Sequence, residues 1–344
     1  MQLYLSGRSL GQMVTSSTDP LDEGVIGRAT TFDVFGGDIG EDRLSGARLT
    51  LGSWLDEQRT VAGGVRFFTT ETERTGYSAG SAGSPVIARP FFNIDPIVNA
   101  EDSYLIAAPG VSQGNIDIHT SSDIINGEVF IRYLMWNDCN VRVDFLTGYH
   151  FNRIDDGLEV RHFSESLAPG GPPPIGASYD VFDSFEVSNE FHGAQVGMMA
   201  EWQLDSLTVN MLGKVSLGNN HQQVTIDGRT IITDPLDNAT VAGGGLFAQP
   251  FSNIGMYENN EFTYIPEFGV TANYALTQCL DLSVGYTFMY FSDVATAGGQ
   301  IDRVVNGSQL NGGSLVGAAR PELPSVVGDN FTLHSINIGI SGKY

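Results

Sequence analysis

Histidines and carboxylates lie close together at two places in the sequence, and this combination is the one that a general base needs. His150 is followed by Asp155 and Asp156, and His192 follows Glu190 at a spacing of two residues. A histidine base requires a partner within hydrogen-bond reach. A hydrolase site at His150 and Asp155 is therefore one hypothesis. The competing and favoured interpretation is a histidine held in a polar network without a catalytic role.

The acidic side chains raise the question of a metal site and of the partners this chain can have. Acidic stretches at 19–24, 37–42 and 153–159 supply oxygen ligands, but none has the twelve-residue spacing of a helix–loop–helix calcium site. No cysteine and histidine group has zinc spacing. We predict no metal site and no cofactor, although divalent cations could bridge acidic loops to lipid headgroups. The net charge of −23 excludes nucleic acid as a partner, because the chain would repel phosphates.

Four pairs of alternating segments, each joined by a short turn, predict β-hairpins as the elements that position these side chains. The pairs are 45–54 with 61–70, 125–136 with 141–152, 190–203 with 207–220, and 261–274 with 280–291. Residues 1–10 and 329–344 each add one strand. Long segments rich in Gly, Pro, Asp, Asn and Ser separate the hairpins, at 11–44, 71–124, 153–189, 221–260 and 292–328. We read these segments as loops.

About ten strands, with short turns at one end and long loops at the other, describe an outer-membrane barrel. The sequence therefore predicts an all-β fold, a single-chain antiparallel transmembrane β-barrel formed by residues 1–344 as one domain. Its short turns would be periplasmic and its long acidic loops extracellular. A barrel has no free edge, so the alternation in 329–344 is explained if the last strand pairs with the first. No stretch approaches the ~18–20 apolar residues of a membrane-spanning helix.

Aromatic residues beside the short turns predict a belt at the membrane interface. Each of the three tryptophans precedes a short turn, a tyrosine holds that place in the fourth hairpin, and another tyrosine ends the chain. Aromatic side chains collect at the headgroup level of membranes. The expected interface aromatics are Trp54, Trp136, Trp202, Tyr274 and Tyr344. Trp54 and Trp136 fall on the polar parity of their strands unless the strand end shifts.

The polar parity of the strands predicts charges inside the barrel. These are basic and acidic in equal number, and they are expected to form a lumen charge network: Arg48, Arg66, Arg132, Arg142, Lys214, Glu128, Asp144, Glu190, Glu201 and Glu267. A turn centred near Asp138 places Arg132 opposite or diagonal to Asp144, where opposite charges pair. Ten strands lie close to the limit at which side chains fill a barrel. We therefore expect a narrow or closed pore.

The two cysteines are predicted not to bond to each other. Cys139 and Cys279 lie in short turns of hairpins four strands apart. Neighbouring strands are about 4.8 Å apart, and a disulfide needs Cα atoms within about 7 Å.

Several stretches make the chain resemble the putative beta-barrel porin-7 family of bacterial outer-membrane proteins. They are "NEFHGAQVGMMAEW" at 189–202, "MLGKVSLGNNHQQVTIDGRT" at 211–230, "PFSNIGMYENNEFTYIPEFGV" at 250–270, "VGYTFMYFSDVATAGGQIDRVVN" at 284–306 and, more weakly, "MVTSSTDP" near the start. The resemblance covers most of residues 13–344 and departs from the family at the final "GISGKY". It implies a barrel in the bacterial outer membrane and little about activity, because none of these motifs is catalytic.

Three classes of function follow from the sequence. The leading hypothesis is a porin-like or structural outer-membrane barrel without enzyme activity, with outer-membrane lipid as its partner. The alternatives are a barrel hydrolase with His150 and Asp155 at the loop rim, and a soluble β-sandwich adhesin. The sequence decides neither the oligomeric state nor any transported solute.

Overall fold

The chain is built almost entirely from β-strands. The computed structural model describes residues 1–344 except 7, 40–43, 169–172 and 343–344. Within these limits it contains seventeen strands and three short 3₁₀ helices, so the all-β expectation is confirmed and the strand number is higher than expected. None of the described helices is long and apolar enough to cross a membrane.

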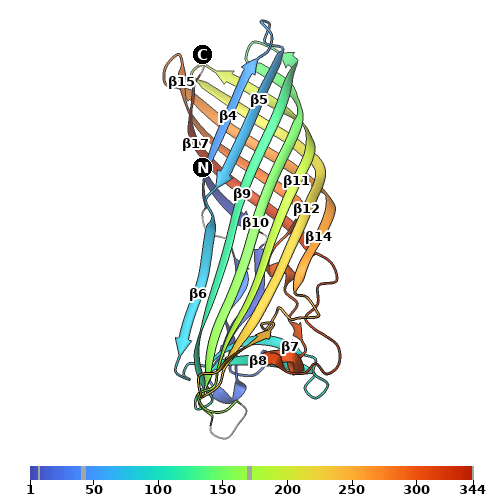
Figure 1. Cartoon of the computed structure of the whole chain (residues 1–344). Coiled ribbons are helices and arrows are strands. Elements are labelled where there is room, and N and C mark those ends of the chain that lie inside the picture. Colours follow the sequence, from blue (N-terminus) through green and yellow to red (C-terminus); the bar gives the residue numbers. More distant parts are fainter. Residues whose placement is uncertain (7, 40–43, 169–172, 343–344) are drawn as a thin grey trace.

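Ten of the strands form a ring of pairings, which we name the strand ring (Figure 1). Its members are β1 (Gln2–Ser6), β4 (Leu44–Trp54), β5 (Val61–Thr70), β9 (Ser112–Asn137), β10 (Val141–Ser166), β11 (Ser178–Leu204), β12 (Leu207–Thr233), β14 (Gly255–Ala275), β15 (Leu280–Ala295) and β17 (Gly328–Gly342). Each is antiparallel to its two neighbours, in the order β1, β4, β5, β9, β10, β11, β12, β14, β15, β17 and back to β1. The last ring strand therefore pairs with the first, with Gln2 opposite Ile336.

The strands β9 to β12 are about twice as long as the hairpin segments in the sequence indicate. Each has 26 or 27 residues, and they extend far beyond the shorter strands of the ring (Figure 1). The expectation of long loops at 153–189 is wrong, because β10 continues to Ser166 and β11 begins at Ser178. The expected loop 71–124 likewise contains three strands and the first half of β9.

The physical reason is that the hydrophobic alternation changes phase along these strands. Near the short turns the outward side chains of β10 are apolar, as in Phe145 and Tyr149, which are 37% and 47% exposed. Farther along, the inward side chains become apolar, with Ile154 and Leu158 almost fully buried. Most outward positions there are polar, and Arg153, Glu159 and Arg161 are exposed. A segment with polar residues at every second position resembles a loop in composition, although its pleat continues without interruption.

A second, smaller sheet lies at the end of the molecule away from the short turns (Figure 1). Its strands are β2 (Arg8–Ser17), β3 (Thr31–Ile39), β7 (Ile87–Asn93), β8 (Ala100–Ala107) and β16 (Val304–Val305), in the order β16, β7, β2, β3 with β8 beside β7. Two further strands extend the main sheet: β6 (Glu73–Ser81) pairs with β9, and β13 (Ala239–Gly243) pairs with β12. The 3₁₀ helices are η1 (Pro20–Asp22), η2 (Gly298–Gln300) and η3 (Gly307–Gly312).

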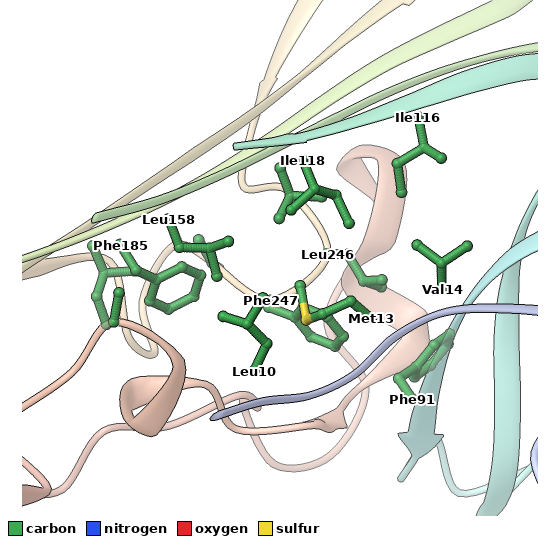
Figure 2. Close-up of a cluster of buried hydrophobic side chains, with 14 of the residues drawn as sticks. Leu10, Met13, Val14, Phe91, Ile116, Ile118, Leu158, Phe185, Leu246 and Phe247 are labelled. Carbon is green, nitrogen blue, oxygen red and sulfur yellow. The ribbon is translucent and has the colours of Figure 1, made fainter. Parts of the chain in front are cut away.

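The second sheet packs against the inward face of the long strands and buries their apolar side chains (Figure 2). Leu10, Met13 and Val14 of β2 meet Ile118 of β9 and Phe185 of β11 in one hydrophobic cluster. Burial of such side chains stabilises the fold by about 1.5–3 kcal/mol each. We name the second sheet and this cluster the plug, because together they cover the inward face of the long strands.

Candidate functional site

Four charged side chains from two strand pairs meet inside the strand ring. Arg66 of β5 lies directly opposite Glu128 of β9, and Lys214 of β12 lies directly opposite Glu267 of β14. The two strand pairs belong to different walls of the ring. We name these four residues the central ion cluster.

The ion pairs of the central ion cluster link the two walls. The Lys214 Nζ lies 2.5 Å from a Glu128 oxygen and 2.9 Å from a Glu267 oxygen. The Arg66 Nη1 lies 3.0 Å from Glu267 and 3.7 Å from Glu128. The charges sum to zero, and the side chain of Lys214 is fully buried. Each cation therefore contacts both carboxylates, and the side chains cross the lumen rather than line it.

A glycine makes room for the buried lysine. Gly197 of β11 lies opposite Lys214 of β12. A Cβ atom at Gly197 would lie 2.4 Å from the Cβ of Lys214, closer than such atoms approach one another. The Lys214 Nζ also donates a hydrogen bond of 2.8 Å to the side-chain oxygen of Gln195. With two ion pairs and this hydrogen bond, all three ammonium protons have acceptors.

His150 joins this buried region and does not form the hydrolase site that its spacing to Asp155 allows. It lies opposite Glu128, and its ring contacts Asn126 on one side and the Ser216 hydroxyl, at 2.7 Å, on the other. The side chain is fully buried. Asp155 is an odd number of residues away on the same strand and points outward, where it pairs with Arg153 at 2.8 Å. The proposed pair is therefore split between the two faces of β10.

The second histidine pair of the sequence does form, but outside the ring. His192 and Glu190 lie 3.1 Å apart on the outward face of β11, and both side chains are more than 40% exposed. The expectation that Glu190 belongs to the lumen network is therefore wrong. It shares its parity with Trp202, which points outward, and side chains an even number of residues apart lie on the same face of a strand.

A second group of charges lies at the rim of the lumen near the short turns. Asp144 of β10 pairs with Arg132 of β9, as its position relative to the turn predicts, and with Arg142 at 2.9 Å. The Asp144 side chain is 1% exposed. Trp54 covers this group, with the guanidinium carbon of Arg142 4.4 Å from its ring.

The remaining predicted lumen residues make weaker contacts. Arg48 donates a hydrogen bond of 3.1 Å to the Thr287 hydroxyl and lies over the ring of Phe68. Glu201 lies opposite Arg142 and accepts a hydrogen bond from Gln203. Both belong to the inward parity, although neither joins the central ion cluster.

The predicted interface aromatics divide into two groups. Trp202 and Tyr274 are about half exposed on the outward face. Trp136 joins them because an irregularity in the β9–β10 register places it opposite Val143, which shifts the parity of the strand end. Trp54 does not join them, since it packs on the arginines at the lumen rim. Tyr344 lies outside the described residues.

Apolar side chains fill the ring between the central ion cluster and the plug. Leu3, Phe68, Phe191, Phe291 and Leu333 belong to one cluster whose members come from every ring strand except β12. Beside it, the Asn189 side chain both donates to the backbone oxygen of Ala295 and accepts from its backbone nitrogen, each at 2.8 Å. These contacts hold the end of β15 against the inner face of β11.

Sequence reasoning missed two buried ion groups in the region of the plug. Arg8 of β2 contacts Glu73 and Asp156, both at 2.7 Å, and these three residues join the second sheet to the long strands. Burial raises the pKa of Asp156, and the charge of Arg8 opposes this effect. The available signal was an acidic residue between Ile154 and Leu158 on the same strand face, where every neighbour is apolar.

The second missed group lies deeper. Arg89 of β7 contacts Asp183 of β11 at 2.7 Å, and both side chains are fully buried. Asp183 also accepts hydrogen bonds from the backbone nitrogens of Phe247 and Ala248. His162 lies 3.3 Å from the same guanidinium group, and burial, together with the charge of Arg89, lowers the pKa of His162 well below its ordinary value.

No group of three His, Cys, Asp or Glu side chains within the described ranges could hold a metal ion. Cys139 and Cys279 are not bonded to each other, as the sequence predicts, and both are exposed.

Comparison with known proteins places the chain in a family. The model of the family Putative beta barrel porin-7 matches residues 1–344. The chain belongs to this family. No curated protein matches the sequence. Among solved structures, the outer membrane protease OmpT from Escherichia coli is similar, with 12% identity over 99% of this chain and 96% of that chain and a TM-score of 0.42.

The central ion cluster predicts a large cost when its lysine loses its charge. Lys214→Met leaves Glu128 and Glu267 with Arg66 alone, and an uncompensated buried charge costs about 3–5 kcal/mol. Adding Glu267→Gln restores the charge balance, so we expect much of the loss to be recovered. The measurement is the free energy of unfolding in urea, with the protein reconstituted in lipid vesicles.

The matched control is Arg153→Met, which removes an arginine that is paired with Asp155 on the exposed outward face. Exposed ion pairs contribute about 0–1 kcal/mol, so this variant should unfold almost like the wild type. Equal costs for Lys214→Met and Arg153→Met would contradict the assignment of a buried, wall-linking cluster.

Proposed function

We propose that the chain is a single-domain outer-membrane β-barrel, in which the strand ring of residues 1–344 spans the lipid and its lumen is closed. The short turns are periplasmic, and the plug and the long strand extensions are extracellular. The family supports the barrel and the membrane. The central ion cluster carries the closed lumen, because it fills the cross-section with balanced, mutually paired side chains.

An apolar belt on the outside of the ring supports the placement in lipid. Large apolar side chains are exposed around the ring on the half nearer the short turns: Leu49, Leu51, Val65, Phe67, Val129, Ile131, Phe145, Val196, Met198, Met211, Leu217, Phe268, Val270, Leu282, Val284, Ile336, Ile338 and Ile340. Contiguous apolar surface of this extent marks a membrane or protein contact. Outer-membrane lipid is the partner that matches a belt running around a ring of antiparallel strands.

Aromatic and histidine side chains border the belt on the side away from the turns. The Tyr286 hydroxyl lies 2.6 Å from a ring nitrogen of His334, and Tyr149 contacts His192 in the same way. Beyond this border the outward positions of β10 carry Arg153, Asp155 and Glu159. Along the strands, the outer surface changes from an apolar belt to an aromatic border and then to a charged surface. This order matches that of lipid core, interface and water. The proposal also includes divalent cations, which would bind the acidic extracellular surface and bridge it to lipid headgroups.

A closed barrel is porin-like in fold but does not act as a diffusion channel. Three groups of side chains occupy the lumen in succession along its axis. They are the rim group at Asp144, the central ion cluster and the apolar cluster around Phe291, and the plug lies beyond them. Such a protein acts through its extracellular surface or as a structural component of the membrane. We include in the proposal that it is not an enzyme, because His150 is buried and separated from Asp155.

Conductance in planar lipid bilayers tests the closed lumen. We expect no steady openings as large as those of a sixteen-stranded porin, which encloses an aqueous channel. Arg132→Ala removes one rim side chain, and the central ion cluster and the apolar cluster still block the path behind it. Its conductance should therefore stay at the wild-type level. Steady porin-sized openings of the wild-type protein would overturn the closed lumen.

Arginine substitutions on the outward face test the position of the lipid. Ile338 is 71% exposed within the apolar belt, and arginine at the middle of the bilayer costs about 2–4 kcal/mol in such barrels. Ile338→Arg should lower the free energy of unfolding in vesicles by about this amount. Ser188→Arg, on the outward face of β11 beyond the aromatic border, should change it by less than about 1 kcal/mol. Similar costs at both positions would be incompatible with the belt.

Activity assays on detergent-solubilised protein test the absence of hydrolysis. We expect no turnover of peptide or ester substrates above the buffer control, since no histidine–carboxylate pair in the described lumen reaches solvent. Hydrolysis that disappears in His150→Ala, while the variant keeps its folded circular dichroism spectrum, would show that the hydrolase alternative is right.

A further inference from the structure

A cavity of about 400 Å³ lies at the end of the molecule away from the short turns. Its walls come from the ends of β9, β10 and β11 on one side and from β7, β8 and η3 on the other. Ser112 of β9 lies opposite Ser166 of β10, and Tyr179 of β11 lies opposite Ser164 of β10. Three strands of the ring thus contribute hydroxyl-bearing residues to the lining of one cavity, whose volume falls within the ordinary range of small-molecule sites.

One of these hydroxyl groups lacks a partner. Ser112 is 7% exposed, and its Oγ has no hydrogen-bond partner among the described residues. A buried polar group without a partner is uncommon, because it has lost its water without a replacement. Ser166, on the facing strand, already donates to the backbone oxygen of Pro173. The Ser112 hydroxyl therefore has a hydrogen-bonding capacity that a ligand with its own donor and acceptor groups would satisfy.

Two tyrosines supply aromatic surface to the same cavity. Tyr104 is fixed on both sides, since its hydroxyl donates 2.9 Å to the Asn311 side chain and its ring lies 4.7 Å from the ring of His162. Tyr179 is only partly buried, and its hydroxyl makes no hydrogen bond of this kind with the residues that the structure describes. Tyrosine combines an apolar face with a polar tip, which suits a ligand that has both apolar C–H faces and hydroxyl groups.

The charges of the cavity exclude an anionic ligand. No arginine or lysine is among the described residues that line it, whereas Asp102 and Glu165 are. Both carboxylates are already engaged: Asp102 accepts from the Asn93 side chain and the Ser103 backbone, and Glu165 accepts from the Gln113 side chain. A phosphate or a uronic acid would meet only negative charge here. A neutral ligand meets hydroxyl, amide and carboxylate acceptors whose positions are set before it binds.

We propose that this cavity is a binding site for a neutral saccharide of one or two sugar units. The sugar would exchange hydrogen bonds with the Ser112 hydroxyl and place a C–H face against Tyr179. The site goes beyond the closed barrel proposed above, and it can be tested whether or not the lumen conducts. Its place at the end farthest from the short turns makes it reachable from the extracellular side of the proposed barrel.

Saturation-transfer NMR and calorimetric titration of the full-length protein in detergent test the site. The neutral probes are maltose, lactose and di-N-acetylchitobiose, with galacturonic acid and spermidine as the anionic and cationic probes. At least one neutral sugar should bind and the charged probes should not. Ser112→Ala should weaken that binding about fivefold, the effect of one neutral hydrogen bond, and Tyr179→Ala about tenfold.

The unfolding midpoint of Ser112→Ala, measured without sugar, separates an effect on binding from an effect on folding. Removing a buried hydroxyl without a partner should leave the unfolding midpoint of the free protein unchanged or raise it, while sugar affinity falls. The matched control is Ser188→Ala, which lies in the larger cavity on the outer face of the long strands and should bind like the wild type. Binding of no neutral sugar, preference for either charged probe, or loss of affinity in Ser188→Ala but not in Ser112→Ala would overturn the proposal.

Discussion

The constraint on which this structure depends is that a backbone in lipid must satisfy its own hydrogen bonds. A sheet can do this only if its last strand pairs with its first. Here β17 pairs with β15 on one side and with β1 on the other, and β1 continues to β4. Once the sheet returns on itself, the inner faces of its strands enclose a space whose size follows from their number. Ten strands leave little more than side chains can fill. The buried ions and the apolar cluster are the result of that closure.

Each long strand runs through two environments, lipid near the short turns and water beyond, without an interruption of its pleat. In the half near the short turns, apolar side chains point out toward lipid and polar ones point in. In the other half, Ile118 of β9, Leu158 of β10 and Phe185 of β11 point in toward the plug. The pattern inverts without a break in the ladder of pairings between β10 and β11. An inverted pattern requires an apolar partner on the inward face of the long strands, and the second sheet is that partner.

The sequence was sufficient for the parts of the fold that depend on local pattern. Short turns and alternation located four hairpins, and the distance from a turn placed Arg132 beside Asp144. The sequence was not sufficient where tertiary packing decides the outcome. The extensions of β10 and β11 have polar residues at outward positions, so they resemble loops until the plug supplies the apolar partner for their other face. Nothing local in 8–17 or 87–93 shows that these segments pack against the inward face of the long strands.

The incorrect predictions of which strand face a side chain occupies had a different origin. The position of Trp136 depends on one irregularity in the β9–β10 register, which a regular alternation does not reveal. Trp54 keeps the inward parity and is held there by two arginines from other strands. The buried groups at Arg8 and Arg89 combine residues more than sixty positions apart. Pairings of this kind follow from topology, and spacing along the chain contains no information about them.

The central ion cluster raises the question of why a filled lumen is not simply apolar. Buried ion pairs gain little stability over well-packed apolar side chains of similar volume. Their advantage in this barrel is that they distinguish the two faces of each strand. With lipid outside and an apolar lumen inside, a strand would be apolar on both faces, and a slip of one residue would exchange the faces at little cost. With Lys214 opposite Glu267 and Arg66 opposite Glu128, the same slip in any one of these four strands turns its charge toward lipid and leaves the opposite charge in the interior. The ion pairs therefore specify the register of strand pairs on two walls of the ring, and the side chains that fix this register also occupy the interior between the walls.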